Sequence, residues 1–314
     1  MKNVHKLTEG AILLAAFTVL LLITVYVPVI GPLIGLVLPM PFIMFSTKNN
    51  LKNIIAFFAA AIVISFITSS FLGLSFMLLY GAVGAVIGYM LQKNQSRASI
   101  LIACTLTFII GLVILYASSV AFFKVDFIHE FTKALKESTK ISSDMLKSLG
   151  QEEKVELLQK QNENLIQLLE TLAPSLLIMV SLFFVFMIQW VCFPIVKRFG
   201  TPVQPWGKLR NLSLPKSLLW YYLIDLGSLM LFHPEEGTYL YLALINARYI
   251  LEWFIVLQGI SCVLFILHQR SGAKGLGVFI VILSFMIPIV HYIIMLVGIT
   301  DLGFDFRKRF MKKE

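Results

Sequence analysis

Charged side chains are scarce in this sequence, and their scarcity excludes an ordinary water-soluble domain. Asp, Glu, Lys and Arg make up 14% of the 314 residues, whereas apolar residues make up 58%. A typical soluble domain carries about 25% charged residues, and one soluble core cannot bury so large an apolar fraction at this chain length. The composition therefore predicts an all-α, polytopic transmembrane helix bundle in which the lipid bilayer replaces the missing core.

The familiar sequence signatures of catalysis are also absent. The chain has no His-Glu-x-x-His, no Gly-x-Ser-x-Gly, no Gly-x-x-x-x-Gly-Lys and no Gly-x-Gly-x-x-Gly. Its cysteines, Cys104, Cys192 and Cys262, each lie alone in an apolar run, without metal-ligand or redox spacing. The sequence thus predicts no enzyme, no metal and no cofactor. Active transport by such a chain would take its energy from an ion gradient or from another subunit.

About nine apolar segments are candidates for membrane-spanning helices, because about 20 apolar residues cross a bilayer. The segment 33–45 is short and Pro-rich, which indicates a broken helix. The segment 239–267 is too long for a straight span, which indicates a tilted helix or an interfacial turn. The full set is 10–30, 33–45, 54–72, 74–91, 99–123, 172–196, 217–232, 239–267 and 276–299.

Lys and Arg fall mainly in alternate short loops, a pattern of membrane anchoring and not of nucleic-acid binding. The positive-inside rule then predicts a multi-pass protein of a bacterial cytoplasmic membrane with a cytoplasmic N-terminus. Nine spans would put the basic tail that starts at Arg307 outside, against the rule, so about eight or nine spans stay open. The inner basic residues are Lys48, Lys52, Lys93, Arg97, Lys197, Arg198, Lys208, Arg210, Lys216, Arg270 and Lys274.

The segment 124–170 is polar and stands apart from the apolar runs. Its apolar residues recur at helical spacing, which predicts two amphipathic helices outside the membrane, broken near Ser142–Ser143 and Gly150. Three interpretations stay open: a solvated hairpin packed on the bundle, a lid over an outward-facing cavity, or a short coiled-coil seam whose register Asn162 fixes.

Three ionisable residues lie inside apolar segments, where charge is costly and often functional. Asp225 lies in the middle of 217–232, and Arg248 and Glu252 lie one helical turn apart in 239–267, a spacing that predicts an ion pair. Two interpretations stay open. Either Arg248 and Glu252 form a structural ion pair that neutralises both charges, with Asp225 near an outer water-filled cleft, or all three residues line a substrate or ion path.

Small residues recur four positions apart, a spacing that lets helix backbones approach closely inside a membrane. Such pairs serve either packing within the bundle or packing against a partner helix. They are Ala11 and Ala15, Gly31 and Gly35, and Gly84 and Gly88.

The order of these features resembles two groups of membrane proteins. The opening Lys6–Ala16 (KLTEGAILLAA) and the short second segment Gly31–Pro41 (GPLIGLVLPMP) resemble the first two helices of S components, the substrate-binding subunits of energy-coupling-factor (ECF) transporters. The closing Gly298–Arg307 (GITDLGFDFR) is similar to the C-terminal signature of the YybS family, uncharacterised membrane proteins of Firmicutes. The YybS resemblance covers essentially the whole chain, and the S-component resemblance covers residues 1–196.

The S-component resemblance implies a six-helix unit at 1–196 that binds a vitamin, metabolite or metal substrate, followed by a membrane extension at 197–314. In that family an Ala-x-x-x-Ala pattern on the first helix packs on the coupling subunit, and Ala11 and Ala15 match it. No substrate-binding motif carries over. The leading hypothesis is an uptake component that works with an ECF coupling subunit and ATPases. The alternative is a membrane scaffold or regulatory partner that keeps the fold without transport.

Overall fold

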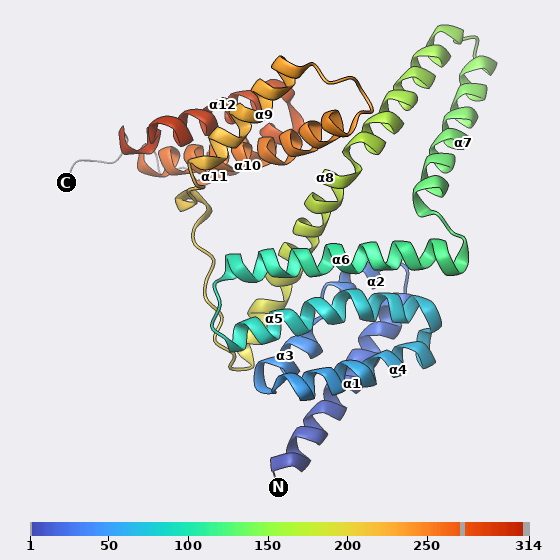
Figure 1. Cartoon of the computed structure of the whole chain (residues 1–314), viewed down its shortest axis with the longest axis vertical. Coiled ribbons are helices and arrows are strands. Elements are labelled where there is room, and N and C mark those ends of the chain that lie inside the picture. Colours follow the sequence, from blue (N-terminus) through green and yellow to red (C-terminus); the bar gives the residue numbers. More distant parts are fainter. Residues whose placement is uncertain (1, 271–273, 310–314) are drawn as a thin grey trace. The chain divides into compact units, whose positions relative to one another are not determined.

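The described part of the chain, residues 2–270 and 274–309 of a computed structural model, contains α-helices and no strand (Figure 1). This confirms the all-α prediction. The helices are α1 (Lys2–Tyr26), α2 (Gly31–Gly35), α3 (Met40–Lys48), α4 (Leu51–Phe76), α5 (Ala82–Gln92), α6 (Arg97–Phe123), α7 (Phe127–Ser148), α8 (Glu152–Arg198), α9 (Ser217–Phe232), α10 (Tyr239–Arg270), α11 (Lys274–Met286) and α12 (Pro288–Phe304), with a π-helical turn at Met77–Gly81 and 3-10 turns at Leu209–Asn211 and Phe306–Arg309.

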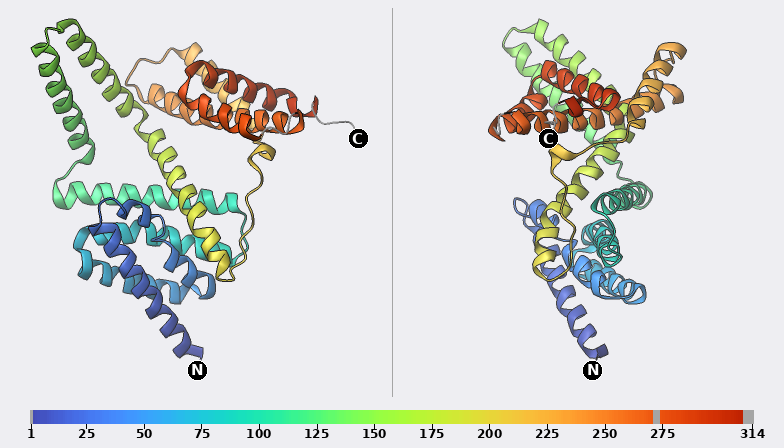
Figure 2. Two further views of the ribbon diagram at one scale, coloured as in Figure 1. Left: turned by 180° about the vertical axis from the view of Figure 1, so that it is seen from behind. Right: turned by 90° about the vertical axis from the view of Figure 1, so that its left-hand side faces the viewer.

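Six helical runs in the described residues are long and apolar enough to cross a membrane, or seven if the bent pair α11 and α12 forms one span. This confirms a polytopic bundle, and the difference from eight or nine spans lies in how broken helices are counted. The 42-residue run Leu51–Gln92 leaves helical geometry at Ser69–Ser70, where the chain turns back within α4 before it continues into α5 (Figures 1 and 2). Helix α9 is short, and α11 and α12 are bent by 115°.

Contacts divide the chain into two compact units. The first comprises Met1–Asn162 and Leu177–Pro205, and the second comprises Glu163–Leu176 and Trp206–Glu314. The division into 1–196 and 197–314 stays a prediction. The two compact units differ from it because the middle of α8 belongs to the second unit.

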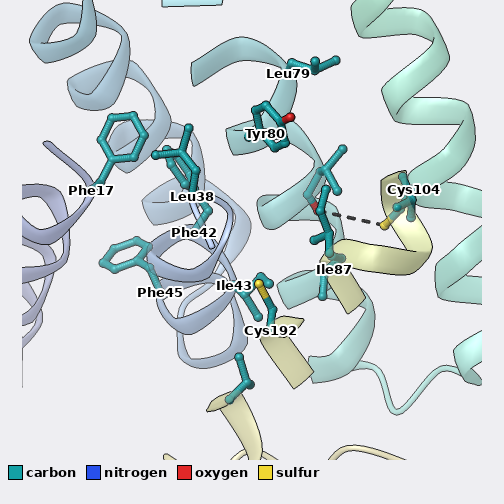
Figure 3. Packing of buried hydrophobic residues seen from close by; sticks show 14 of the residues in the cluster. Phe17, Leu38, Phe42, Ile43, Phe45, Leu79, Tyr80, Ile87, Cys104 and Cys192 are labelled. Atoms are coloured by element: carbon teal, nitrogen blue, oxygen red, sulfur yellow. Dashed lines mark hydrogen bonds between the residues drawn. The ribbon is translucent and has the colours of Figure 1, made fainter. Parts of the chain in front are cut away.

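Aromatic side chains fill the centre of the first unit (Figure 3). Phe42 of α3 is buried, and its ring meets Phe17 of α1 edge-on at 5.0 Å and Phe57 of α4 at 5.3 Å. The buried thiol of Cys192 on α8 donates to the carbonyl of Leu36 at 3.3 Å. The apolar interior therefore ties α1, α3, α4 and α8 together by packing.

The predicted glycine pairs lie inside the first unit, where they allow close backbone contact. A Cβ atom at Gly84 would meet the carbonyl oxygen of Pro39, the N-cap of α3, at 2.5 Å, and one at Gly88 would meet that of Ile43 at 2.6 Å, so α3 and α5 pack backbone against backbone. Gly31 and Gly35 are also buried, and both lie against Thr24 of α1. In this unit the four glycines serve internal packing.

Residues 124–170 form a helical hairpin that continues into a membrane helix. Asp126 caps α7 by accepting from the backbone N–H groups of Ile128 at 3.0 Å and His129 at 3.1 Å. The bond from His129 is the main cause that lowers the pKa of Asp126. The chain turns at Gly150, whose φ of 69° suits glycine. The predicted break near Ser142–Ser143 is wrong, because α7 runs through it with Ser143 buried.

In the second unit, α10 and α12 run parallel and pack directly on each other. Helix α11 connects them in sequence and runs in the opposite direction. Gly277 of α11 lies against Leu264 near the end of α10, and Phe285 at the end of α11 stacks on Trp253 at 5.9 Å. Helix α12 then runs back along α10, and a Cβ atom at Gly298 would collide with the carbonyl oxygen of Ile255. Helices α11 and α12 therefore enter and leave this unit at the same end.

Candidate functional site

The candidate site lies on the packed face of α9. Residues of α9 at helical spacing, Tyr222 and Asp225 among them, turn toward α10, and most of the opposite face is exposed. Asp225 is only 5% exposed, and neither of its carboxylate oxygens has a hydrogen-bond partner. Buried polar groups almost always have partners, so an orphan carboxylate needs a functional or structural explanation.

The facing part of α10 carries the predicted ion pair. The Arg248 Nε donates to the Glu252 Oε1 at 2.9 Å, with side chains that are 42% and 30% exposed. Asp225 interacts electrostatically with both residues, and Tyr222 interacts with Glu252. The structure thus brings together all three ionisable residues that the sequence singled out, and adds Tyr222. We call Tyr222, Asp225, Arg248 and Glu252 the mid-helix cluster.

An asparagine fixes α10 beside this cluster. The Asn246 side chain accepts from the backbone N–H of Ser175 at 2.9 Å and donates to the carbonyl of Thr171 at 2.7 Å. In a regular helix the N–H of Ser175 would donate to the carbonyl of Thr171. Next to Pro174 the Asn246 side chain bonds both groups instead. Sequence reasoning missed Asn246, although a proline inside an apolar helix is a signal that a neighbour must satisfy freed backbone groups.

The break between α11 and α12 lies close to the cluster along α10. Trp253, the neighbour of Glu252 in sequence, contacts Phe285 before the break and His291 after it, with the His291 ring edge-on at 6.0 Å. Ile287 at the break has extended geometry, which the following Pro288 favours. Non-helical backbone at membrane depth is tolerated where protein or a water-filled cavity surrounds it.

A second polar network joins the middle of α10 to the C-terminal end of α12. The Asp301 Oδ2 accepts from the Gln258 Nε2 at 2.6 Å and from the Arg307 Nε at 2.7 Å. Arg307 also donates to the carbonyl of Arg210 at 3.1 Å, and Ser261 donates to carbonyls of the same loop. This network, the inner clasp, is internally satisfied, and sequence reasoning missed it.

The two alanines predicted to face a partner lie on the surface of the first unit. Ala11 and Ala15 are both exposed on α1, in contrast to the buried glycine pairs. Beside them an open hollow of about 520 Å³ lies between α1 and α3, lined by Thr8, Glu9, Ile12, Leu13 and Met44. The described residues contain no group of three or more His, Cys, Asp or Glu side chains that could hold a metal ion.

Comparison with known proteins identifies the family of this chain. The family model "Predicted membrane protein (DUF2232)" matches residues 15–302. The chain belongs to this family. "Uncharacterized protein YybS" of Bacillus subtilis (strain 168) is 30% identical over 310 residues, which cover 98% of this chain and 99% of the relative. No solved structure matches.

Membership of the DUF2232 family confirms the resemblance to YybS and the character of a multi-pass membrane protein in a lipid bilayer. The C-terminal residues that carried the resemblance have structural roles in this chain. Gly298 allows the close crossing of α12 on α10, and Asp301 and Arg307 form the inner clasp.

Proposed function

We propose that this DUF2232 protein binds a small charged solute within the membrane and takes part in its uptake, without acting as an enzyme. The observation that carries the proposal is Asp225, a buried carboxylate without a hydrogen-bond partner, beside the Arg248–Glu252 pair. Ionisable side chains at membrane depth commonly mark substrate or ion paths. The adjacent break between α11 and α12 supports a site there, because interrupted helices often form transporter binding sites.

A binding screen tests this proposal. We expect one class of charged metabolite or ion to raise the melting temperature of the purified full-length protein in lipid nanodiscs. The Asp225→Asn and Arg248→Gln variants should lose this stabilisation, whereas Asp144→Asn, on the exposed surface of α7, should keep it. A broad screen without any stabilising compound, or a ligand that the Asp225 and Arg248 variants still bind, would overturn the proposal.

A second function rests on a different surface. Exposed Ala11 and Ala15, together with the hollow beside Ile12, suit a partner helix that packs against α1 in the bacterial cytoplasmic membrane. The partner would be an ECF-type coupling subunit with its ATPases if uptake is driven by other subunits, or another membrane protein if the chain is a scaffold.

Affinity purification from native membranes in mild detergent distinguishes these partners. Tagged wild type is compared with Ala11→Trp plus Ala15→Trp, and with the control Phe66→Trp, which changes an exposed residue on α4. A coupling protein with ATPases that is lost only in the alanine variant would support coupled uptake. A different membrane protein lost in the same way would support the scaffold, and equal recovery from all three would refute docking at α1.

A further inference from the structure

We propose that Asp225 is a proton-binding site that loads and releases one proton within the membrane. This deepens the proposed function, because a chain without a nucleotide-binding motif can draw energy from a proton gradient. The inference does not require that a solute be known, so its test stands apart from the binding screen.

Charge balance is the first argument. In the mid-helix cluster one guanidinium faces two carboxylates, so the cluster carries one uncompensated negative charge when all three residues are ionised. The Nε of Arg248 is already bonded to Glu252, and Asp225 receives no hydrogen bond. A buried carboxylate without a donor is costly, and a single bound proton removes that charge.

Ligand geometry favours a proton over a metal cation. Hard cations in proteins take about six oxygen ligands. Among the described residues no group of His, Cys, Asp or Glu is large enough to hold a metal, and the Glu252 Oε1 is engaged by Arg248. A proton needs only one carboxylate oxygen, which Asp225 offers.

The surroundings of Asp225 supply few competing groups. Among the described helices, α10 and α12 pack against α9, and one contact with α12 joins Gly303 to Leu219 near the start of α9. The titratable and charged side chains that act on Asp225 therefore come from α9 and α10. They are Tyr222, Arg248 and Glu252, while Asp305 at the end of α12 pairs with Lys216.

Carbodiimide labelling tests the site in the full-length protein in lipid nanodiscs. Dicyclohexylcarbodiimide is apolar and reacts with protonated carboxyl groups, adding across the O–H of the acid and rearranging to a stable N-acylurea. We expect peptide mass spectrometry to find Asp225 labelled at low pH, with labelling falling at least tenfold as the pH rises. Asp301 is an internal control, because it is equally buried but paired with Arg307, and it should stay unlabelled.

Two further arms separate a proton from a cation. Replacing choline chloride with sodium or potassium chloride at constant pH and ionic strength should leave Asp225 labelling unchanged within a factor of two. Cation protection would overturn the proton assignment in favour of an alkali-metal site. Absent labelling across pH 5 to 9, or labelling independent of pH, would refute exchange of a proton at Asp225. An Asp225→Glu variant should retain pH-dependent labelling if it folds, and the wild-type result decides the question if it does not.

Discussion

The inner clasp predicts a large and specific loss of stability when Asp301 is removed. In Asp301→Ala the Gln258 amide and the Arg307 guanidinium lose their bonds of 2.6 and 2.7 Å to the same carboxylate oxygen. The Arg307 side chain is only 13% exposed, so its charge would stay largely desolvated. Removing one partner of a buried ion pair costs about 3–5 kcal/mol, and we expect a decrease in this range in the free energy of unfolding.

A neighbouring ion pair provides the matched control. Lys216 and Asp305 pair at 2.8 Å, but their side chains are 59% and 35% exposed. Exposed pairs contribute about 0–1 kcal/mol, so Lys216→Ala should shift stability by less than about 1 kcal/mol. Both variants break an ion pair near the same end of α12, and the two pairs differ in the burial of the charge.

The assay combines unfolding with proteolysis of the loop that the clasp holds. Tryptophan fluorescence during denaturant titration in mild detergent reports stability, and trypsin cleavage after Arg210 reports release of the loop, because Arg307 and Ser261 bond its carbonyls. Asp301→Ala should unfold earlier and be cleaved faster. Adding Arg307→Ala to it should restore part of the loss, because no unpaired charge remains. Equal, small effects of Asp301→Ala and Lys216→Ala would refute the argument.

Three further predictions follow from the fold. Gly298→Val should lower the unfolding free energy by about 1–3 kcal/mol, because its Cβ would collide with α10. In contrast, Gly227→Ala, with open space around it inside α9, should raise the same fluorescence-detected stability by up to about 1 kcal/mol. Because the pKa of Asp126 is lowered in the folded state, its support of α7 is complete above its ordinary pKa and is lost as the pH falls through the lowered value. Circular dichroism should show Asp126→Asn less helical than wild type at pH 6, and this difference should shrink as the pH is lowered. Single cysteines placed in the loop 206–216 and at the exposed Phe304 of a cysteine-free variant should react with a membrane-impermeant thiol reagent from the same side of the membrane. Reaction from opposite sides would contradict the parallel course of α10 and α12.

Local spacing was enough to predict part of the site. Arg248 and Glu252 are four residues apart on one helix, and this spacing fixes their proximity whatever the rest of the fold does. Asp225 could be recognised as exceptional because an acid interrupts an otherwise apolar segment. The sequence alone could not show that α9 and α10 bring these residues together. Their proximity depends on which helices pack together and on the rotation of each about its axis.

The inner clasp was beyond such reasoning, because its members lie far apart in the sequence. Gln258 and Asp301 are separated by 43 positions, and Arg307 and Arg210 by 97. No periodicity links them, and each alone looks like an ordinary polar residue. Broken helices gave a mixed result: the predicted boundary between 54–72 and 74–91 lies close to the reversal at Ser69–Ser70, whereas 276–299 was predicted as one segment although Pro288 favours the break inside it.

The course of α11 and α12 removes the conflict between nine apolar segments and the basic tail. A full crossing would separate the tail from the loop before α9 by about 30 Å, yet Arg307 bonds the carbonyl of Arg210 and Asp305 pairs with Lys216. Helix α11 therefore brings the chain only as far as Trp253 before α12 returns it to the same end. With the two on one side, the positive-inside rule predicts a cytoplasmic location for both. The same re-entrant course places the α11–α12 break beside Trp253, which follows Glu252 in the sequence. The re-entrant pair that satisfies the positive-inside rule therefore also brings non-helical backbone to the level of the mid-helix cluster.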